Sequence, residues 1–360
     1  MLTNAGHEAW FVGGCVRNAL MGAPVSDLDM STNALPDVVM QLAMASGLKA
    51  IPTGIDHGTI TIISGGLPYE VTTFRRDIAT DGRCAIVAFA DDMIDDARRR
   101  DFTMNALYAG SDGVIADPLN GLSDLANRRV RFIDDAEQRI KEDYLRILRF
   151  FRFHAWYGNQ DDGIDAEGLA ACAAHIEGLQ QLSKERVGQE ILKLLSAPNP
   201  STAVASMASC GVLTQVIPGA DSGALAILVH VEGLAGLAPD AIRRLAVIGG
   251  MDVAVNLRLS KSDAARRDLI VSGQPNATLA YREGAEVAIN SLAVEAASLQ
   301  QEIDAKQIDL ARFAAEQVFP VKAADLMPAF TGPALGAALK KAEVRWIASD
   351  FTLTKDALLE

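Results

Sequence analysis

The chain has 360 residues, 49% of them hydrophobic, and a formal net charge of −13. This length favours two or three domains, and the hydrophobic residues are sufficient for more than one core. The acidic balance argues against a simple nucleic-acid-binding protein, so any polyanionic substrate must meet local basic patches.

The cysteines and the apolar segments indicate a cellular compartment. Four widely spaced cysteines are present: Cys15, Cys84, Cys172 and Cys210. Without a C-x-x-C pair or clustered histidines, they argue against a disulfide framework or a structural zinc site. The N-terminus has no basic region followed by an apolar run, and the longest apolar stretch, 224–237, contains His230 and Glu232. We therefore expect a cytoplasmic protein without a membrane segment.

The first part of the chain alternates short β-rich runs with turns, which predicts a small α/β unit. The expected strands are 10–12, 27–30, 59–63, 69–74 and 114–117. A helix is predicted over 36–47, because its apolar residues follow helical spacing and Gly47 suits the position after a helix end.

A glycine pair lies between the first predicted strand and the helix that follows. Gly13 and Gly14 allow backbone amides to approach a phosphate closely, and Arg17 follows one turn later. A glycine pair alone is common in turns, and a D-x-D pair alone is common too. The glycine pair followed by the two aspartates described next predicts a triphosphate-binding turn.

Two aspartates then alternate along the next predicted strand. Asp27 and Asp29 are two residues apart, so on a strand their side chains point to the same face. Paired carboxylates bind hard cations and suit phosphate chemistry. Glu70, on a neighbouring predicted strand, is either a third active-site carboxylate or an ordinary edge-strand residue.

Residues 77–97 are rich in carboxylates and are predicted to form an exposed loop. The aspartates of this segment are Asp77, Asp81, Asp91, Asp92, Asp95 and Asp96. The run that follows, Arg98 to Leu107, combines cations with a carboxylate, a hydroxyl and an amide, which suits triphosphate and ribose contacts. Taken alone, it is equally consistent with a charged helix start capped by Asp101.

From about residue 122 the strand signals fade, and helices are predicted to the end of the chain. The expected turns between helices are 198–200, 217–219, 273–275 and 331–333.

A strongly amphipathic helix is predicted over 142–152. Its charged residues step by three: Asp143, Arg146, Arg149 and Arg152. They form either an ordinary surface stripe of ion pairs or a base-recognition surface. In the second case arginine donates and aspartate accepts, which matches the edge shared by cytosine and adenine, where a ring-nitrogen acceptor lies beside an exocyclic amine.

Five motifs in order resemble those of the class II tRNA nucleotidyltransferases, which add CCA to tRNA 3′ ends. They read G-G-C-V-R-N, D-L-D, R-R-D-F-T-M-N-A-L, D-P-L-N-G and E-D-Y-L-R-I-L-R. The resemblance implies an α+β fold, in which a polymerase-β-like nucleotidyltransferase head precedes an all-helical neck, body and tail. The implied head covers 1–121, a helical neck with base recognition covers 122–200, and a tRNA-binding body and tail cover 201–360.

The same resemblance assigns roles to residues of this chain. Asp27 and Asp29 correspond to catalytic carboxylates that hold Mg²⁺. The implied nucleotide-binding residues are Gly14, Arg17, Arg99, Arg100, Asp143, Arg146, Arg149 and Arg152, among which Asp143 and Arg146 read the base. The segment 77–96 resembles a flexible element used in switching from C to A addition, and 117–121 resembles a hinge between head and neck.

The implied activity is template-independent CCA addition to the tRNA acceptor end from CTP and ATP by two-metal transfer, with release of pyrophosphate. Alternatives are a poly(A) polymerase, a partial CC- or A-adding enzyme, or a catalytically silent RNA-binding protein. Asn18 stands where the family usually has aspartate, which leaves the orientation of Arg17 open. The adjacent His-Asp pair of an appended phosphohydrolase is missing from the sequence, so we expect no second activity. The oligomeric state is left open.

Overall fold

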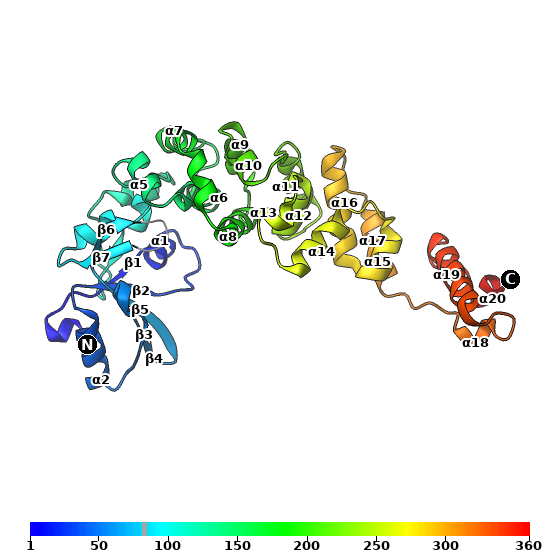
Figure 1. Ribbon diagram of the computed structural model, residues 1–360, viewed down its shortest axis with the longest axis horizontal. Helices are drawn as coiled ribbons and strands as arrows, with labels where there is room; N and C mark the ends of the chain where they lie inside the picture. Colours follow the sequence, from blue (N-terminus) through cyan, green and yellow to red (C-terminus); the bar gives the residue numbers. More distant parts are fainter. Residues whose placement is uncertain (81–84) are drawn as a thin grey trace. The chain divides into compact units, whose positions relative to one another are not determined.

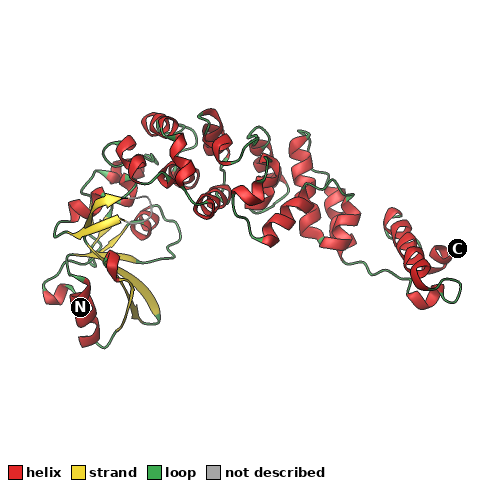
Figure 2. Ribbon diagram, in the orientation of Figure 1, coloured by secondary structure: helices red, strands yellow, loops and turns green. Residues whose placement is uncertain are grey.

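The computed structural model describes residues 1–80 and 85–360 (Figure 1). These residues form two compact units. Unit 1 contains Met1–Leu194 and Thr202–Val216, and unit 2 contains Leu195–Ser201 and Ile217–Glu360. Figure 2 shows the strands in unit 1, with helices making up most of the remaining chain. The predicted α+β class is confirmed, whereas the domain boundaries at 121 and 200 stay a prediction.

A mixed sheet forms the centre of the N-terminal part of unit 1. Its strands are β1 (Trp10–Val12), β2 (Asp29–Thr32), β3 (Lys49–Gly54), β4 (Thr59–Ser64), β5 (Leu67–Thr73), β8 (Tyr108–Ala109) and β9 (Ile115–Ala116). They lie in the order β3-β4-β5-β2-β1-β8-β9, and β2 pairs with β5 in parallel while the other pairs are antiparallel. The parallel pair places the start of β2 beside the middle of β5.

Side-chain alternation fixes which face of this sheet is covered. Along β5, Val71 and Thr73 are buried while Glu70 is exposed, as the two-residue period of a strand requires. Helix α2 (Pro36–Ala45) covers the buried face, where Val39 and Ala43 lie one turn apart. The exposed face at this point carries the carboxylates.

The segment predicted to be a loop is largely regular structure, so that prediction is wrong. Strands β6 (Arg75–Thr80) and β7 (Ala85–Phe89) form a separate antiparallel pair, and helix α3 (Met93–Arg98) follows. Asp96 is fully buried because two arginines neutralise it, an arrangement that carboxylate density in the sequence cannot indicate. The part of the prediction that concerns 81–84 lies outside the described residues.

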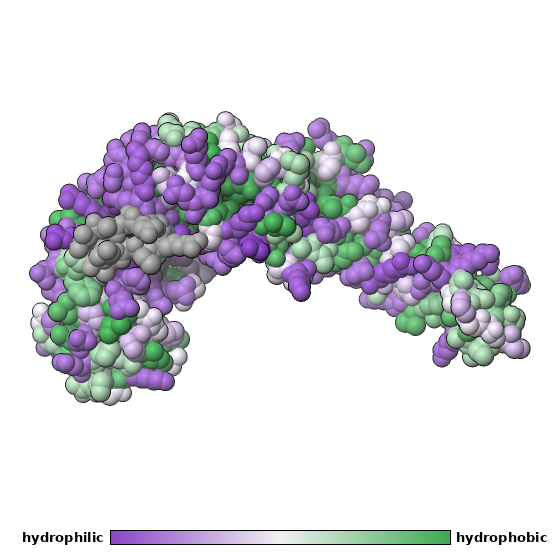
Figure 3. Space-filling view, viewed as in Figure 1, coloured by the Kyte–Doolittle hydropathy of each residue, from purple (hydrophilic) through white to green (hydrophobic). Residues whose placement is uncertain are grey.

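The helical part of unit 1 follows the sheet, as predicted. Its helices are α1 (Gly14–Leu20), within the sheet region, then α4 (Gly121–Ala126), α5 (Ala136–Glu142), α6 (Leu145–Tyr157), α7 (Ala166–Ala174), α8 (Lys184–Leu195, whose last residue is grouped with unit 2), α9 (Ser201–Ser209, whose first residue is also grouped with unit 2) and α10 (Val212–Val216). Figure 3 shows mainly hydrophilic surface around α5 and α6.

The single helix predicted over 142–152 is in fact divided. Helix α5 ends at Glu142 and Asp143 has extended backbone angles. The carboxylate of Asp143 then accepts a hydrogen bond from the amide of Leu145, 3.0 Å away, where α6 begins. The break places Asp143 outside the helix that carries the arginines.

An aromatic cluster joins α6 to the motif at 98–107. The ring of Phe102 lies 5.0 Å from that of Phe132 and 4.9 Å from that of Phe153, measured between centroids, and Phe150 stacks on Phe132 at 5.2 Å. Such aromatic contacts add to the burial of large apolar surfaces. They hold the polar face of α6 against the R-R-D-F motif.

The regular elements of unit 2 are helices. Its helices are α11 (Leu225–Leu234), α12 (Ala241–Ile248), α13 (Val253–Asn256), α14 (Lys261–Ile270), α15 (Asn276–Glu283), α16 (Ala285–Ser298), α17 (Ala305–Ala315), α18 (Ala323–Leu326), α19 (Gly332–Ala348) and α20 (Lys355–Leu359). Trp346 and Phe351 are buried in one of its cores. Within residues 1–80 and 85–360, none of the helices combines the length and apolar character that a bilayer crossing requires.

Candidate functional site

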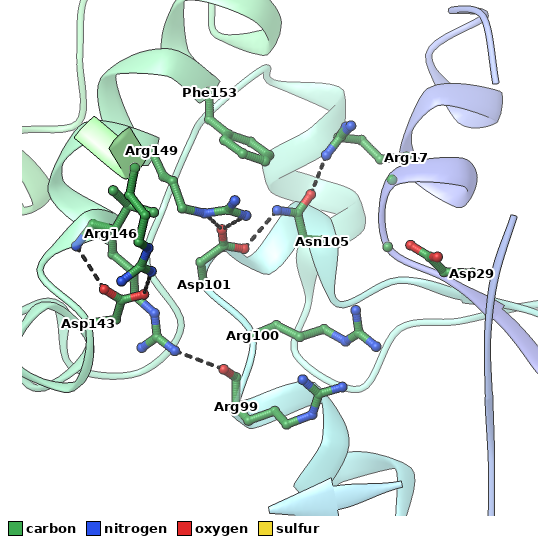
Figure 4. A pocket seen from close by; sticks show the side chains of 14 residues that line it. Arg17, Asp29, Arg99, Arg100, Asp101, Asn105, Asp143, Arg146, Arg149 and Phe153 are labelled. Atoms are coloured by element: carbon green, nitrogen blue, oxygen red, sulfur yellow. Dashed lines mark hydrogen bonds and ion pairs between the residues drawn. The ribbon is translucent and has the colours of Figure 1, made fainter. Parts of the chain in front are cut away.

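A cavity of about 470 Å³ lies in unit 1, where α1, the 98–107 motif and α6 meet (Figure 4). Three of its lining residues are the aspartates Asp29, Asp101 and Asp143. The lining arginines number six: Arg17, Arg99, Arg100, Arg146, Arg149 and Arg186. In a chain with an overall charge of −13, this excess of cations is local and suits a multiply charged anion.

The glycine turn forms one wall of the cavity. Gly13 has a φ of +76°, which favours glycine, and a Cβ there would lie 3.2 Å from Nη1 of Arg100. Its amide donates to the carbonyl of Leu107 at 3.2 Å. The turn therefore brings the backbone of Gly13 and Gly14 against the second motif, as expected of a phosphate-binding turn.

Arg17 is buried and its hydrogen bonds go to neutral oxygens. Its guanidinium donates to Oδ1 of Asn105 at 2.5 Å, to Oδ1 of Asn18 at 2.9 and 3.1 Å, and to the hydroxyl of Tyr157 at 2.9 Å. Burial lowers the pKa of Arg17, and Tyr157 and Asp101 partly oppose this effect. Asn18, whose role the sequence left open, thus orients Arg17 without neutralising it.

Arg99 and Arg100 are fixed by Asp96, a residue that the sequence analysis placed in a loop. The two guanidinium groups lie 2.8 and 2.9 Å from the carboxylate oxygens of Asp96, and the hydroxyl of Tyr108 also donates to it at 2.8 Å. Burial alone would raise the pKa of Asp96, but Arg100 and Arg99 hold it well below its usual range. Asp96 therefore stays ionised and keeps both arginines in place.

Asp101 connects α6 with the first helix through a continuous set of hydrogen bonds (Figure 4). It accepts from Arg149 at 2.5 and 2.8 Å and from Nδ2 of Asn105 at 2.8 Å, and Asn105 in turn accepts from Arg17. Burial opposes ionisation of Asp101, but Arg149, Asn105 and the amide of Phe102 lower its pKa to about 2. Asp101 is therefore not the helix cap considered from the sequence; it forms a bridge between Arg149 and Asn105.

Asp143 and Arg146 both line the cavity but do not bind each other through their side chains. Arg146 donates to Glu142 at 2.6 Å and to the carbonyl of Arg99 at 3.1 Å, whereas Asp143 accepts from Arg186 of α8 at 2.7 Å. The stripe of i, i+3 ion pairs considered for this segment is therefore wrong. Arg146 is held instead by Glu142, four residues earlier, and Asp143 by Arg186, which is distant in the sequence.

Arg152, although expected at the nucleotide, does not line this cavity. Its Nε lies 2.6 Å from Oε2 of Glu190 on α8, and both side chains are buried to about the same extent. Its guanidinium carbon lies 4.6 Å from the ring centroid of Phe153, which does line the cavity. Its assignment as a nucleotide-binding residue stays a prediction.

A second cavity of about 720 Å³ adjoins Asp29 and is lined by Asp27 and Glu70 as well. Asp29 is the first residue of β2 and Asp27 precedes the strand, so the predicted placement of both on one strand is wrong. Partial desolvation raises the pKa of Asp29, Arg100 lowers it, and Asp27 raises it further. The two carboxylates are therefore close enough to repel, an arrangement that a divalent cation would relieve.

Glu70 lies directly across the parallel ladder from Asp29. Even so, no three histidine, cysteine, aspartate or glutamate side chains in the described part of the chain are arranged to hold a metal ion. A metal ion bound by only Asp27 and Asp29 would keep coordination positions open for substrate oxygens.

Several site residues were missed from the sequence, for different reasons. Asp96 pairs with arginines only three and four residues later, a spacing that could have been read locally, but it stands among other aspartates. Arg186 carries no local motif, and its contact with Asp143 depends on tertiary packing. Phe153 could have been found, because it lies four residues after Arg149 and so on the same helical face.

Paired aspartates at the start of the central strand of a mixed sheet, beside a cavity lined by arginines and a glycine turn, define the site of a nucleotidyltransferase. Two family descriptions match parts of the chain. Residues 9–131 match "Poly A polymerase head domain", and residues 163–223 match "Probable RNA and SrmB- binding site of polymerase A".

The chain is 32% identical to the mouse mitochondrial CCA tRNA nucleotidyltransferase 1 over 98% of its own length and 86% of that protein. It is 38% identical to the CCA-adding enzyme of Levilactobacillus brevis, over 59% of this chain and about half (52%) of that relative. The structure of the Bacillus stearothermophilus CCA-adding enzyme with CTP matches with a TM-score of 0.76 and 26% identity, covering 97% and 91% of the two chains.

The chain therefore belongs to the family of CCA-adding tRNA nucleotidyltransferases. Members of this family use divalent metal ions. Because the relatives include both mitochondrial and bacterial proteins, a cytoplasmic location stays a prediction.

Proposed function

We propose that this protein adds CCA to the 3′ end of tRNA without a nucleic-acid template, using CTP and ATP and releasing pyrophosphate. The observation that carries the proposal is the arginine-lined cavity that shares Asp29 with the carboxylate-lined cavity beside it. The first suits the triphosphate and base of an incoming nucleotide, and the second suits the attacking hydroxyl of the RNA end. Asp29 lies between them, where the new bond would form.

The proposed cofactor is Mg²⁺, held by Asp27 and Asp29. When bound there, the metal would stabilise charge on the phosphoryl oxygens and make the 3′ hydroxyl a better nucleophile. Side chains of the protein supply further positive charge. Arg17 and Arg100 face the cavity, and their charges would bind the triphosphate of the incoming nucleotide and the pyrophosphate that leaves it.

Base selection is proposed for Asp143 and Arg146. Arg186 holds the carboxylate of Asp143, which is an acceptor, and Glu142 holds the guanidinium of Arg146, which is a donor. Both groups are therefore fixed on the cavity wall. An acceptor beside a donor complements the edge that cytosine and adenine share. Rigid anchoring favours selection because a mismatched base would place a donor against the fixed donor or an acceptor against the fixed acceptor.

The test is incubation of the purified protein with Mg²⁺, CTP, ATP and tRNA transcripts that lack CCA, CA or A, followed by sequencing of the products. Addition that stops after CCA is expected. Long A tails would instead identify a poly(A) polymerase, the runner-up suggested by the head-domain match, and partial products would identify a CC- or A-adding enzyme. No addition to any of these transcripts would contradict the proposal.

Base selection has its own test. Arg146→Ala should relax the preference for CTP and ATP over GTP and UTP as well as lower the rate, because the donor that faces the base is lost. Arg129→Ala is the matched control, since it removes an arginine that pairs with Asp165 outside the cavity. An unchanged preference in Arg146→Ala would contradict the assignment.

A further inference from the structure

The position of the Arg17 side chain depends on Tyr157, the last residue of α6, which no sequence motif indicated. Tyr157 lies eleven residues after Arg146, on the helical face that carries Arg149 and Phe153 toward the cavity. Its hydroxyl accepts from Nη2 of Arg17 at 2.9 Å, and its ring centroid lies 3.9 Å from the guanidinium carbon. The two residues are 140 positions apart, so only the tertiary fold joins them.

The remaining contacts of Arg17 explain why this matters. Its other hydrogen-bond acceptors, Asn18 and Asn105, are amide oxygens, and the ring of Phe153 lies 5.2 Å from the guanidinium carbon. A carboxylate partner would fix the guanidinium and also cancel its charge. Here neutral groups fix it, so its charge remains for a ligand, and an aromatic face adds cation–π attraction.

We propose that Tyr157 is a positioning residue that holds Arg17 toward the triphosphate of the incoming nucleotide without pairing it with a carboxylate. The inference rests on the proposed function, since it assigns Arg17 to the triphosphate. Because Tyr157 is not among the residues lining the cavity, it acts through Arg17. Its contribution is to the triphosphate, so it is the same for every nucleoside triphosphate, in contrast to that of Arg146, which is assigned to the edge shared by cytosine and adenine.

The decisive test is a double-mutant cycle with Arg17→Ala and Tyr157→Phe, with inorganic tripolyphosphate as the probe and calorimetry at one fixed Mg²⁺ concentration as the measurement. Tyr157→Phe keeps the ring and removes the acceptor, so we expect binding to weaken about three- to tenfold, as for the net loss of one ordinary hydrogen bond. Tyr157→Leu also removes the ring and should weaken binding further. In the Arg17→Ala background, Tyr157→Phe should change binding less than about twofold.

Tyr69→Phe is the matched control. It removes the same atom from a tyrosine that lines a separate apolar cavity beside Val71, and it should bind tripolyphosphate as the unmodified protein does. In nucleotide addition, Tyr157→Phe should raise KM for CTP and for ATP by one common factor with kcat within about twofold, since ground-state binding is what it loses.

The inference is overturned if Tyr157→Phe binds tripolyphosphate normally, if it loses as much affinity without Arg17 as with it, or if CTP and ATP are affected differently. Its failure is distinguishable from that of the proposed function. A protein that adds no nucleotides would contradict the proposed function, while the binding cycle would still decide whether Tyr157 acts through Arg17.

Discussion

Replacement of Asp101 by asparagine tests how the site is held together. The carboxylate accepts hydrogen bonds from Arg149, Asn105 and the amide of Phe102 while only 7% exposed. Asparagine offers one acceptor oxygen in place of two, and its NH₂ group must face a donor from either Arg149 or Asn105. The variant therefore leaves the Arg149 guanidinium buried without a carboxylate and at least one donor without an acceptor.

The magnitude follows from the pKa. A folded-state value of about 2, against the ordinary 3.8, corresponds to about 2 kcal/mol of stabilisation from the ionised carboxylate at neutral pH. A mispaired buried donor costs a further 1–3 kcal/mol, roughly. We expect Asp101→Asn to lose about 3–5 kcal/mol of unfolding free energy at pH 7, as is typical when one partner of a buried pair is removed.

The pH dependence has a definite sign. Because the folded-state pKa of Asp101 is depressed, its stabilisation is complete above the unfolded value near pH 4 and is lost as pH falls toward about 2. The difference between the original protein and the variant, measured by urea unfolding at several pH values, should be constant from pH 7 to about 5 and shrink below about 4.

Asp91→Asn, a change of the same kind at an exposed position, serves as the control and should alter stability by less than about 0.5 kcal/mol. If Asp101→Asn is as stable as this control, or if its deficit does not depend on pH between 4 and 2, the reasoning about Asp101 fails.

Three further predictions concern single side chains. Because the pKa of Asp29 is raised in the folded protein, its ionised form destabilises the fold above that pKa. Asp29→Asn should therefore raise the melting temperature at pH 7 while abolishing nucleotide addition. A lower melting temperature would contradict this. Arg244→Met leaves Glu232, which is 3% exposed, with one arginine partner instead of two, and should cost about 3 kcal/mol or more in urea unfolding. Arg186→Ala releases Asp143 and should weaken the preference for CTP and ATP over GTP about tenfold in competition assays, whereas an unaltered preference would refute its anchoring role.

Local patterns predicted many elements of this fold, though not β3, β6, β7 or β8, and many of the residues that line the cavity. Alternating apolar residues placed β1, β4 and β5 within a few positions, and helical spacing ending at Gly47 placed α2. These succeed because a strand or helix is decided by neighbours two to four residues away. The glycine turn with Arg17 and the pair Asp27 and Asp29 were equally local, since a short motif carries both the backbone geometry and the functional groups.

The failures share one physical cause, which is that a charged group can be buried when a partner neutralises it. Asp96 looked like part of a solvated acidic loop, yet Arg99 and Arg100, three and four residues later, make it a buried centre of the site. The regular spacing of charges after Asp143 looked like one surface stripe. The backbone breaks there instead, Arg146 pairs with Glu142 before the break, and Arg149 pairs with the distant Asp101.

The sequence by itself therefore determined which chemical groups are present: a glycine turn, two carboxylates and a set of arginines in a recognisable order. Only the tertiary structure decided which arginines face the cavity, which carboxylate fixes each of them, and that Arg17 is held by Asn18, Asn105 and Tyr157 without a carboxylate. The reason is that the strength of an ion pair depends on distance and burial, and both are set by packing between residues far apart in the chain.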